Sequence, residues 1–333
     1  MKLKKLFLFA TVAAISFCSC NKHQTTETST SGVTSIMCDQ SFENIMNQEI
    51  DVFEYTYPEA SIVPYYVSEA EAVDSLLATS TRLIVIPHKL SQDKIDYLES
   101  KKKNVKTQQI AVDAIALIVN NENPVEELSL SEIGDILLGK VTNWNEISPN
   151  KSGEIMMVFD HQNSSTVKYM RDSLTNGQFF AKNVFAQGSN QAVIDVVKKR
   201  KNAIGVIGVT WLNTNLDGMA NGTDTTAMKI KMERLQRNDT TELSYEGNNM
   251  LSKDIKVLGV RRNDNPVAYK PYQYYIYTGE YPLYRSIYAI CIGANGTLPH
   301  GFYSFLTGVI SQKIILNTGI LPAIMPQRQV TLY

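Results

Sequence analysis

Strand-like and helix-like segments alternate along most of this 333-residue chain, and that alternation constrains the fold most strongly. Largely apolar runs indicate a buried strand at 82–87 and a long strand at 108–119. Amphipathic patterns at 42–55 and 164–174 predict helices between such strands. A chain of this kind is expected to fold as α/β, with mixed sheets flanked by helices.

The length and charge of the chain limit the number of lobes and the kind of partner that we expect. Removing residues 1–19 as a signal leaves 314 residues, which is long for one core and suits two lobes. The remainder carries 29 Lys and Arg against 33 Asp and Glu, a net charge near −4. This balance argues against a nucleic-acid partner, because such proteins carry a clustered excess of basic residues.

The N-terminus has the pattern of an export signal. A basic start at Lys2, Lys4 and Lys5 precedes an apolar run, 6–17, that is too short to span a membrane stably. The segment that follows, Phe17-Cys18-Ser19-Cys20, resembles a bacterial lipoprotein processing site with Cys20 as the lipidated residue. Ordinary signal cleavage is the alternative. Residues 20–32 are polar and rich in Thr and Ser, which favours a flexible tether. We therefore expect a protein of the cell envelope, anchored by lipid on its periplasmic or extracellular face.

Two cysteines remain after processing, Cys38 and Cys291. An exported protein allows a disulfide between them, and two buried free thiols are the alternative. The sequence contains no Gly-x-Ser-x-Gly elbow, phosphate-binding P-loop or His-Glu-x-x-His zinc motif. These observations give no reason to expect an enzyme.

Several motifs occur in a fixed order. They are the strand 110–120, the segment Gly139-Lys140-Val141-Thr142-Asn143-Trp144 within 136–147, the turn and strand 203–208, the segment Gly279-Glu280-Tyr281-Pro282-Leu283-Tyr284-Arg285, and Gly319-Ile320-Leu321-Pro322. Together they resemble the phosphate-type periplasmic substrate-binding proteins of ABC importers, over about residues 33–325. The resemblance implies a type II two-lobe clamshell. Lobe one would hold 33–109 and 260–333, lobe two would hold 110–259, and the hinge would close around a ligand.

The aromatic residues of these motifs have two interpretations. Trp144 is expected as a buried core anchor, with ligand stacking as the alternative. Segments 272–277 and 287–292 are predicted as strands. The tyrosines of this region are expected as half-buried strand residues: Tyr272, Tyr274, Tyr275, Tyr277, Tyr281, Tyr284 and Tyr288. Carbohydrate stacking by these tyrosines is the alternative.

The resemblance also implies where a ligand would bind. The family binds phosphate between the lobes without a metal or cofactor, using two loops that precede helices. Here these loops are 38–41 and 160–166. The expected ligand-binding residues are Gln40, Ser41, Ser164, Ser165 and Thr166, with Lys89 or His161 supplying positive charge. Ser164 or Ser165 could instead simply cap a helix. The implied partners are a phosphate-like oxyanion and an ABC permease, and a monomer is expected.

Some residues depart from the family pattern. Asp160 stands where the family usually has Arg, Asp39 falls among the donors of the first loop, and Pro87-His88-Lys89 replaces a Ser-Asp or Ser-Arg pair. Two carboxylates within ~5 Å of a dianion would cost several kcal/mol. A second hypothesis is therefore a relative that has lost phosphate affinity and binds another small ligand or a protein. A metal held by Asp39, His88, Asp160 and His161 is a further variant of that hypothesis.

Overall fold

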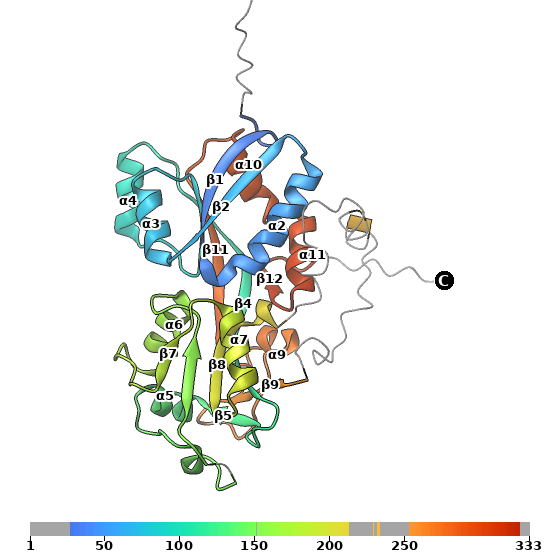
Figure 1. The fold of residues 1–333 in the computed structure, drawn as a ribbon. Coiled ribbons are helices and arrows are strands. Elements are labelled where there is room, and N and C mark those ends of the chain that lie inside the picture. Colours follow the sequence, from blue (N-terminus) through green and yellow to red (C-terminus); the bar gives the residue numbers. More distant parts are fainter. Residues whose placement is uncertain (1–26, 151, 213–228, 230–231, 234–252, 327–333) are drawn as a thin grey trace, which may run out of the picture.

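The structure is a computed structural model that describes residues 27–150, 152–212, 229, 232–233 and 253–326. The expected signal and Cys20, and most of residues 214–249, lie outside the described residues. The chain forms two lobes, lobe one at the top of Figure 1 and lobe two at the bottom. Within the described ranges, no helix has the length and apolar character needed to cross a membrane.

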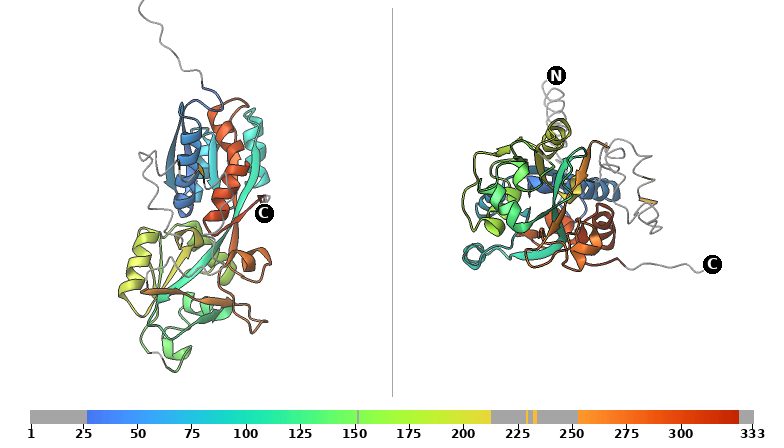
Figure 2. Two further views of the ribbon diagram at one scale, coloured as in Figure 1. Left: turned by 90° about the vertical axis from the view of Figure 1, so that its right-hand side faces the viewer. Right: turned by 90° about the horizontal axis from the view of Figure 1, so that it is seen from below.

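Two long strands connect the lobes. β4 (Lys106–Asn120) pairs with β11 (Tyr284–Cys291) through its first half and with β8 (Ala203–Gly208) through its second half. Both pairings are antiparallel, so one sheet continues from lobe one into lobe two. Figure 2 shows β4 passing from one lobe into the other. Residues 114–119 of β4 are apolar and buried, as expected for a strand covered on both faces.

Lobe one has the strand order β2-β1-β3-β11-β4. The three N-terminal strands are parallel, and β11 runs antiparallel to its neighbours. β2 lies at the edge and contains Pro64, which suits a position where one N–H is not needed. The elements are β1 (Gly32–Asp39), β2 (Ala60–Val67), β3 (Leu83–Ile86), α2 (Glu43–Thr56), α3 (Glu69–Leu77), α4 (Gln92–Ser100), α10 (Leu298–Phe305), α11 (Val309–Asn317) and β12 (Leu321–Pro322).

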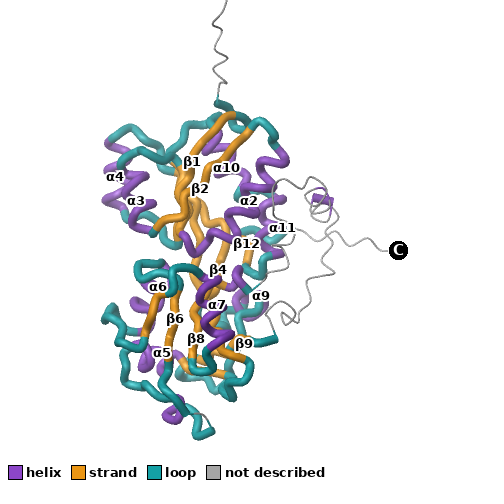
Figure 3. Tube along the Cα trace, in the orientation of Figure 1, coloured by secondary structure: helices purple, strands orange, loops and turns teal. Residues whose placement is uncertain are grey.

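Lobe two continues the sheet in the order β4-β8-β6-β7, with β9 also paired to β4. A separate pair joins β5 and β10. Figure 3 shows helices on the faces of these strands. The elements are β5 (Glu127–Ser129), α5 (Leu130–Leu137), η2 (Trp144–Glu146), β6 (Met156–Phe159), α6 (Ser165–Leu174), β7 (Val184–Ala186), α7 (Asn190–Lys199), η3 (Val209–Trp211), β9 (Ile255–Val257), β10 (Gly259–Arg261) and α9 (Gln273–Tyr277).

The buried core confirms several expectations from the sequence. Trp144 has no exposed surface, and its indole N–H donates to the Asn202 carbonyl oxygen at 3.1 Å. The ring therefore anchors the core of lobe two, as expected. Cys38 and Cys291 are both buried free thiols.

One predicted strand is wrong. Within the predicted strand 272–277, Gln273–Tyr277 form the short helix α9, and Tyr272 is its N-cap. The Tyr275 ring contacts those of Tyr269, Tyr272 and Tyr274 at centroid distances of 4.8 to 6.2 Å. Such clustering, together with burial of Ile276, outweighs the strand preference of tyrosine.

The described topology also bears on the boundary between the lobes. β10 pairs with β5, and α9 lies beside lobe two in Figure 1, although the sequence had placed residues after 259 in lobe one. We therefore propose that residues 259–261 belong with lobe two and that the chain returns to lobe one along β11. Gln273 of α9 donates to the Leu316 and Ile320 carbonyl oxygens, so α9 also contacts lobe one.

Candidate functional site

Two loops from opposite lobes meet at the hinge. The first follows β1 and contains η1 (Gln40–Phe42), and the second follows β6 and leads into α6. The Ser41 hydroxyl oxygen lies 3.2 Å from that of Ser165 and 3.3 Å from that of Thr166. All three side chains are buried. The structure thus brings together three of the predicted site residues.

Helix capping fixes how the second loop presents its side chains. Ser164 is the N-cap of α6, and its hydroxyl oxygen accepts a hydrogen bond from the Val167 N–H at 3.2 Å. This capping role is the alternative weighed for Ser164. Because Ser164 ends the loop, Ser165 and Thr166 occupy the first turn of α6, where free N–H groups favour an anion.

The Asp39 carboxylate lies within this cluster. Its Oδ1 accepts a hydrogen bond from the Ser41 N–H at 2.9 Å and another from the Ser165 hydroxyl at 2.8 Å. The side chain is fully buried. Burial raises the pKa of Asp39 above its ordinary value, against the lowering effects of Arg285 and of the hydrogen bonds from both serines.

Arg285 supplies a cation that the sequence reasoning did not assign. Its Nη1 donates to the Ser165 hydroxyl oxygen at 2.8 Å, while Nε and Nη2 donate to Asp113 Oδ2 at 3.3 and 3.2 Å. The guanidinium also lies 4.8 Å from the centre of the Phe42 ring. Arg285 belongs to the Tyr-Pro-Leu-Tyr-Arg motif, so the motif carried a signal, but its partners are distant in sequence. We call Asp39, Ser41, Asp113, Ser165, Thr166 and Arg285 the hinge cluster.

Asp160 has a different environment from the one its position in the loop suggested. Its backbone carbonyl accepts hydrogen bonds from the Gln187 and Gly188 N–H groups at 3.0 and 2.6 Å. Its carboxylate is buried, and neither oxygen has a hydrogen-bond partner among the described residues. Asp160 therefore holds the loop through its backbone and makes no hydrogen bond to the hinge cluster.

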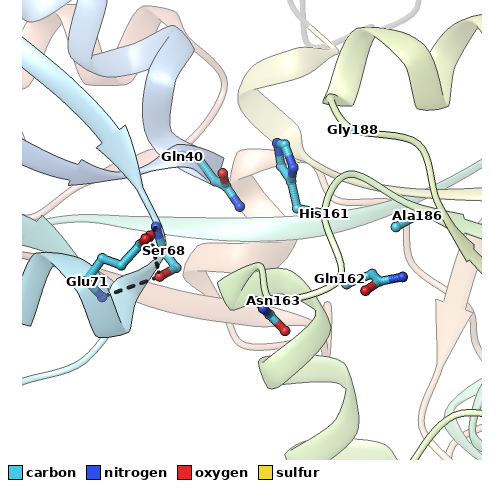
Figure 4. Close-up of a pocket in the computed structure, with 8 residues that line it drawn as sticks. All are labelled: Gln40, Ser68, Glu71, His161, Gln162, Asn163, Ala186 and Gly188. Carbon is cyan, nitrogen blue, oxygen red and sulfur yellow. Dashed lines mark hydrogen bonds between the residues drawn. The ribbon is translucent and has the colours of Figure 1, made fainter.

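A polar cleft of about 600 Å³ opens beside the hinge cluster. Figure 4 shows Gln40 from lobe one and His161 from lobe two lying opposite each other across it. The remaining lining residues are Ser68, Glu71, Gln162, Asn163, Ala186 and Gly188. Both predicted residues therefore lie in the outer cleft, and neither makes a hydrogen bond to the buried hydroxyl groups.

Lys89 lies elsewhere. It is exposed, and its ammonium sits 5.5 Å from the centre of the Tyr288 ring, on β11. A different lysine, Lys168 of α6, reaches across the lobes to Glu69 of α3 at 3.0 Å, and His88 contacts the same carboxylate at 3.0 Å. Lys168 and Glu69 form an exposed ion pair between the lobes.

The metal alternative gains no support from this geometry. Within the described parts of the chain, no three His, Cys, Asp or Glu side chains are grouped closely enough to hold a metal ion. His88 contacts Glu69, whereas Asp39 accepts hydrogen bonds from serine residues.

The sequence matches one protein-family model and several curated proteins. The model of the PBP superfamily domain matches residues 23–309. The phosphate-binding protein PstS 2 of Streptococcus pneumoniae TIGR4 is 24% identical over 129 residues, 38% of this chain and 42% of that protein. PstS of Pseudomonas aeruginosa PAO1 is 23% identical over 202 residues, 57% of this chain and 62% of that protein. The alignments thus span less than two thirds of these curated relatives.

Solved structures match more of the chain. A Clostridium perfringens protein described as a phosphate ABC transporter substrate-binding protein with bound phosphate has a TM-score of 0.64 at 19% identity. That match covers 88% of this chain and 100% of the other. An ABC-type phosphate transport receptor from Vibrio cholerae has a TM-score of 0.57 at 16% identity, covering 87% and 99%. At these identities the likeness establishes the fold, an α/β clamshell.

Proposed function

This chain belongs to the PBP superfamily, and on that premise we propose that it captures phosphate or a related oxyanion between its lobes for an ABC importer. The family is one of substrate-binding transport proteins rather than enzymes. The observation that carries the proposal is the meeting of Ser41 from lobe one with Ser165 and Thr166 from lobe two. Hydroxyl groups contributed by both lobes are what a receptor needs if it is to close around its ligand.

The chemistry of the hinge cluster supports an anionic ligand. Hydroxyl groups, the first turn of α6 and a buried guanidinium are all donors, and together they favour a negatively charged acceptor. Burial strengthens each of these interactions, because water no longer competes for the donors. Arg285 contacts Ser165 directly, so a positive charge is present although Asp160 occupies the position of the family's usual Arg.

The proposal also includes anchoring of the protein to a membrane and delivery of its ligand to a transporter. Cys20 would carry the lipid, and the closed receptor would deliver its ligand to an ABC permease. The residues between Cys20 and Glu27 would act as the tether, because Glu27 already pairs with Arg82 of lobe one. The lipoprotein-like segment before Cys20 and the names of the relatives support this role. Metabolic labelling with a radioactive fatty acid tests the anchor. Label should appear in the wild type and disappear in Cys20→Ser, and equal labelling of both would exclude lipidation at Cys20.

A binding experiment tests the site. Phosphate, sulfate and other oxyanions would be titrated into the full-length wild type and into Ser41→Ala. Loss of one hydrogen bond to a charged ligand should weaken binding by about 1.5–3 kcal/mol. Ser131→Ala is the control, because Ser131 is exposed on α5. Equal affinity of the wild type and Ser41→Ala would place the binding site elsewhere.

Asp39 favours a second candidate function. Its carboxylate already accepts donors from both loops, so the site could have lost affinity for dianions. In that case the protein would bind another small ligand or a protein partner through the same lobes. A panel of oxyanions, metals and neutral organic solutes separates the two functions, because only the first predicts saturable binding of an oxyanion.

A further inference from the structure

We propose that Asp39 is a specificity-determining residue whose carboxylate competes with the anionic ligand for the donors of both loops. This inference rests on the proposed function, since it takes the hinge cluster as the oxyanion site. It assigns to Asp39 a role as an internal anion that an incoming ligand must displace.

The hydrogen bonds of Ser165 carry the first step. A serine hydroxyl has one proton to donate and two lone pairs to accept with. The proton goes to Asp39 Oδ1 at 2.8 Å, and the oxygen accepts from Arg285 Nη1 at 2.8 Å. The Ser41 hydroxyl lies at 3.2 Å from the same oxygen and can fill the second lone pair. Ser165 therefore has no proton left for a ligand while Asp39 holds its position.

Asp39 also occupies a donor of the first loop. The Ser41 N–H donates to Asp39 Oδ1 at 2.9 Å, so one carboxylate oxygen takes a donor from each lobe. The Ser41 hydroxyl lies within reach of both Ser165 and Thr166. An oxyanion that used the Ser41 N–H and the Ser165 hydroxyl would have to exchange places with the carboxylate.

Charge makes the competition stronger. Among the residues of the hinge cluster, Arg285 carries a positive charge while Asp39 and Asp113 carry carboxylates. Ionised, these three groups sum to one negative charge. Like charges repel more strongly in a buried site than in water, so the ligand is disfavoured by the same carboxylate that occupies its donors.

Two substitutions at one position test the proposal with inorganic phosphate as the probe. Asp39→Asn keeps the shape and removes the charge, and Asp39→Ser still offers an oxygen to cap η1. We expect phosphate to bind Asp39→Asn at least about tenfold more tightly than the wild type, because neutral acceptors hold donors about half as strongly as ionised ones. Glu43→Gln is the matched control. It removes one negative charge at the start of α2, where Glu43 has no hydrogen bond to the hinge cluster. Its affinity should stay within about threefold of the wild type, because Glu43 holds none of the donors of the hinge cluster.

Isothermal titration of the full-length proteins, with circular dichroism to verify folding, separates the outcomes. Tighter binding in both Asp39 variants supports the inference. If only the variants bind phosphate, the inference stands and the importer function of the wild type falls. If the wild type binds and the folded variants bind equally or more weakly, the inference is overturned and the function stands. If none of the proteins binds, both are overturned.

Discussion

The hydroxyl of Ser165 donates a hydrogen bond to the Asp39 carboxylate at 2.8 Å, joining residues 126 positions apart from opposite lobes. This contact brings a donor that suits an oxyanion and a carboxylate that opposes one into the same buried site. The same contact therefore supports anion binding through the serine donor and limits it through the carboxylate.

Removing the hydroxyl groups of the second loop should weaken anion binding. The double substitution Ser165→Ala with Thr166→Ala deletes two buried donors near Ser41. We expect phosphate affinity to fall by about 2–4 kcal/mol, since hydrogen bonds to a charged ligand contribute about 1.5–3 kcal/mol each and are not fully additive. Isothermal titration measures the change. The sequence had suggested Ser164 as a ligand donor alongside Ser165 and Thr166, but Ser164 caps α6, so Ser164→Ala should act mainly on stability.

Arg285 should be critical for folding as well as for binding. Arg285→Met would leave the Asp113 carboxylate buried without its cation, at a cost of about 3–5 kcal/mol in the free energy of unfolding. Adding Asp113→Asn should restore part of the loss, because the uncompensated charge is then gone. Urea unfolding of the two single variants and the double variant gives the coupling. If the changes in unfolding free energy of the two single variants add up to that of the double variant, the two side chains do not act as a pair.

The buried Asp39 should make stability depend on pH. Burial raises the pKa of Asp39 in the folded state, so ionising this carboxyl costs more free energy in the folded chain than in the unfolded chain. Its contribution is fully present below the ordinary Asp pKa of about 3.9 and is lost as pH rises through the folded value. Asp39→Asn should therefore gain most stability over the wild type near pH 7 and least near pH 4. Asp113 and Arg285 remain in both proteins, so the difference isolates Asp39. A gap that is constant across this range would contradict the assignment.

Gly205 should tolerate no side chain. A Cβ at this position of β8 would lie 2.8 Å from carbon atoms of Ile118, Val193 and Val197. These belong to the adjacent strand and to α7, and branched side chains there have little freedom to move. Gly205→Ala should destabilise the protein by about 1–3 kcal/mol through overpacking. Chemical denaturation measures this loss of unfolding free energy. An unchanged midpoint of the unfolding curve would mean that α7 can shift without cost.

The sequence was sufficient for the parts of the fold that depend on local pattern. Largely apolar runs located β3 and β4, and Gly-Lys-Val-Thr-Asn-Trp located the buried Trp144. Helix α9 was missed because contacts of Tyr275 with other rings, rather than local propensity, decide its conformation. Tertiary contacts of this kind are not visible in one sequence.

For the candidate site, the sequence located the two loops but not the residue that supplies the positive charge between them. Both loops were expected to meet, and Ser41 does contact Ser165 and Thr166. The position of Arg285 depends on partners 120 and 172 residues away, which spacing alone cannot reveal. Lys89 was a reasonable source of charge by position in the loop, but its side chain extends over Tyr288.

The most direct test of the central claim is isothermal titration of phosphate into the full-length wild type, stripped of bound ligand by unfolding and refolding. The proposed function predicts saturable binding with a Kd in the micromolar range or tighter, about −8 kcal/mol or better. An absence of heat at millimolar phosphate, at several temperatures and with demonstrably folded protein, would contradict the phosphate-receptor function and favour a different ligand for the same clamshell.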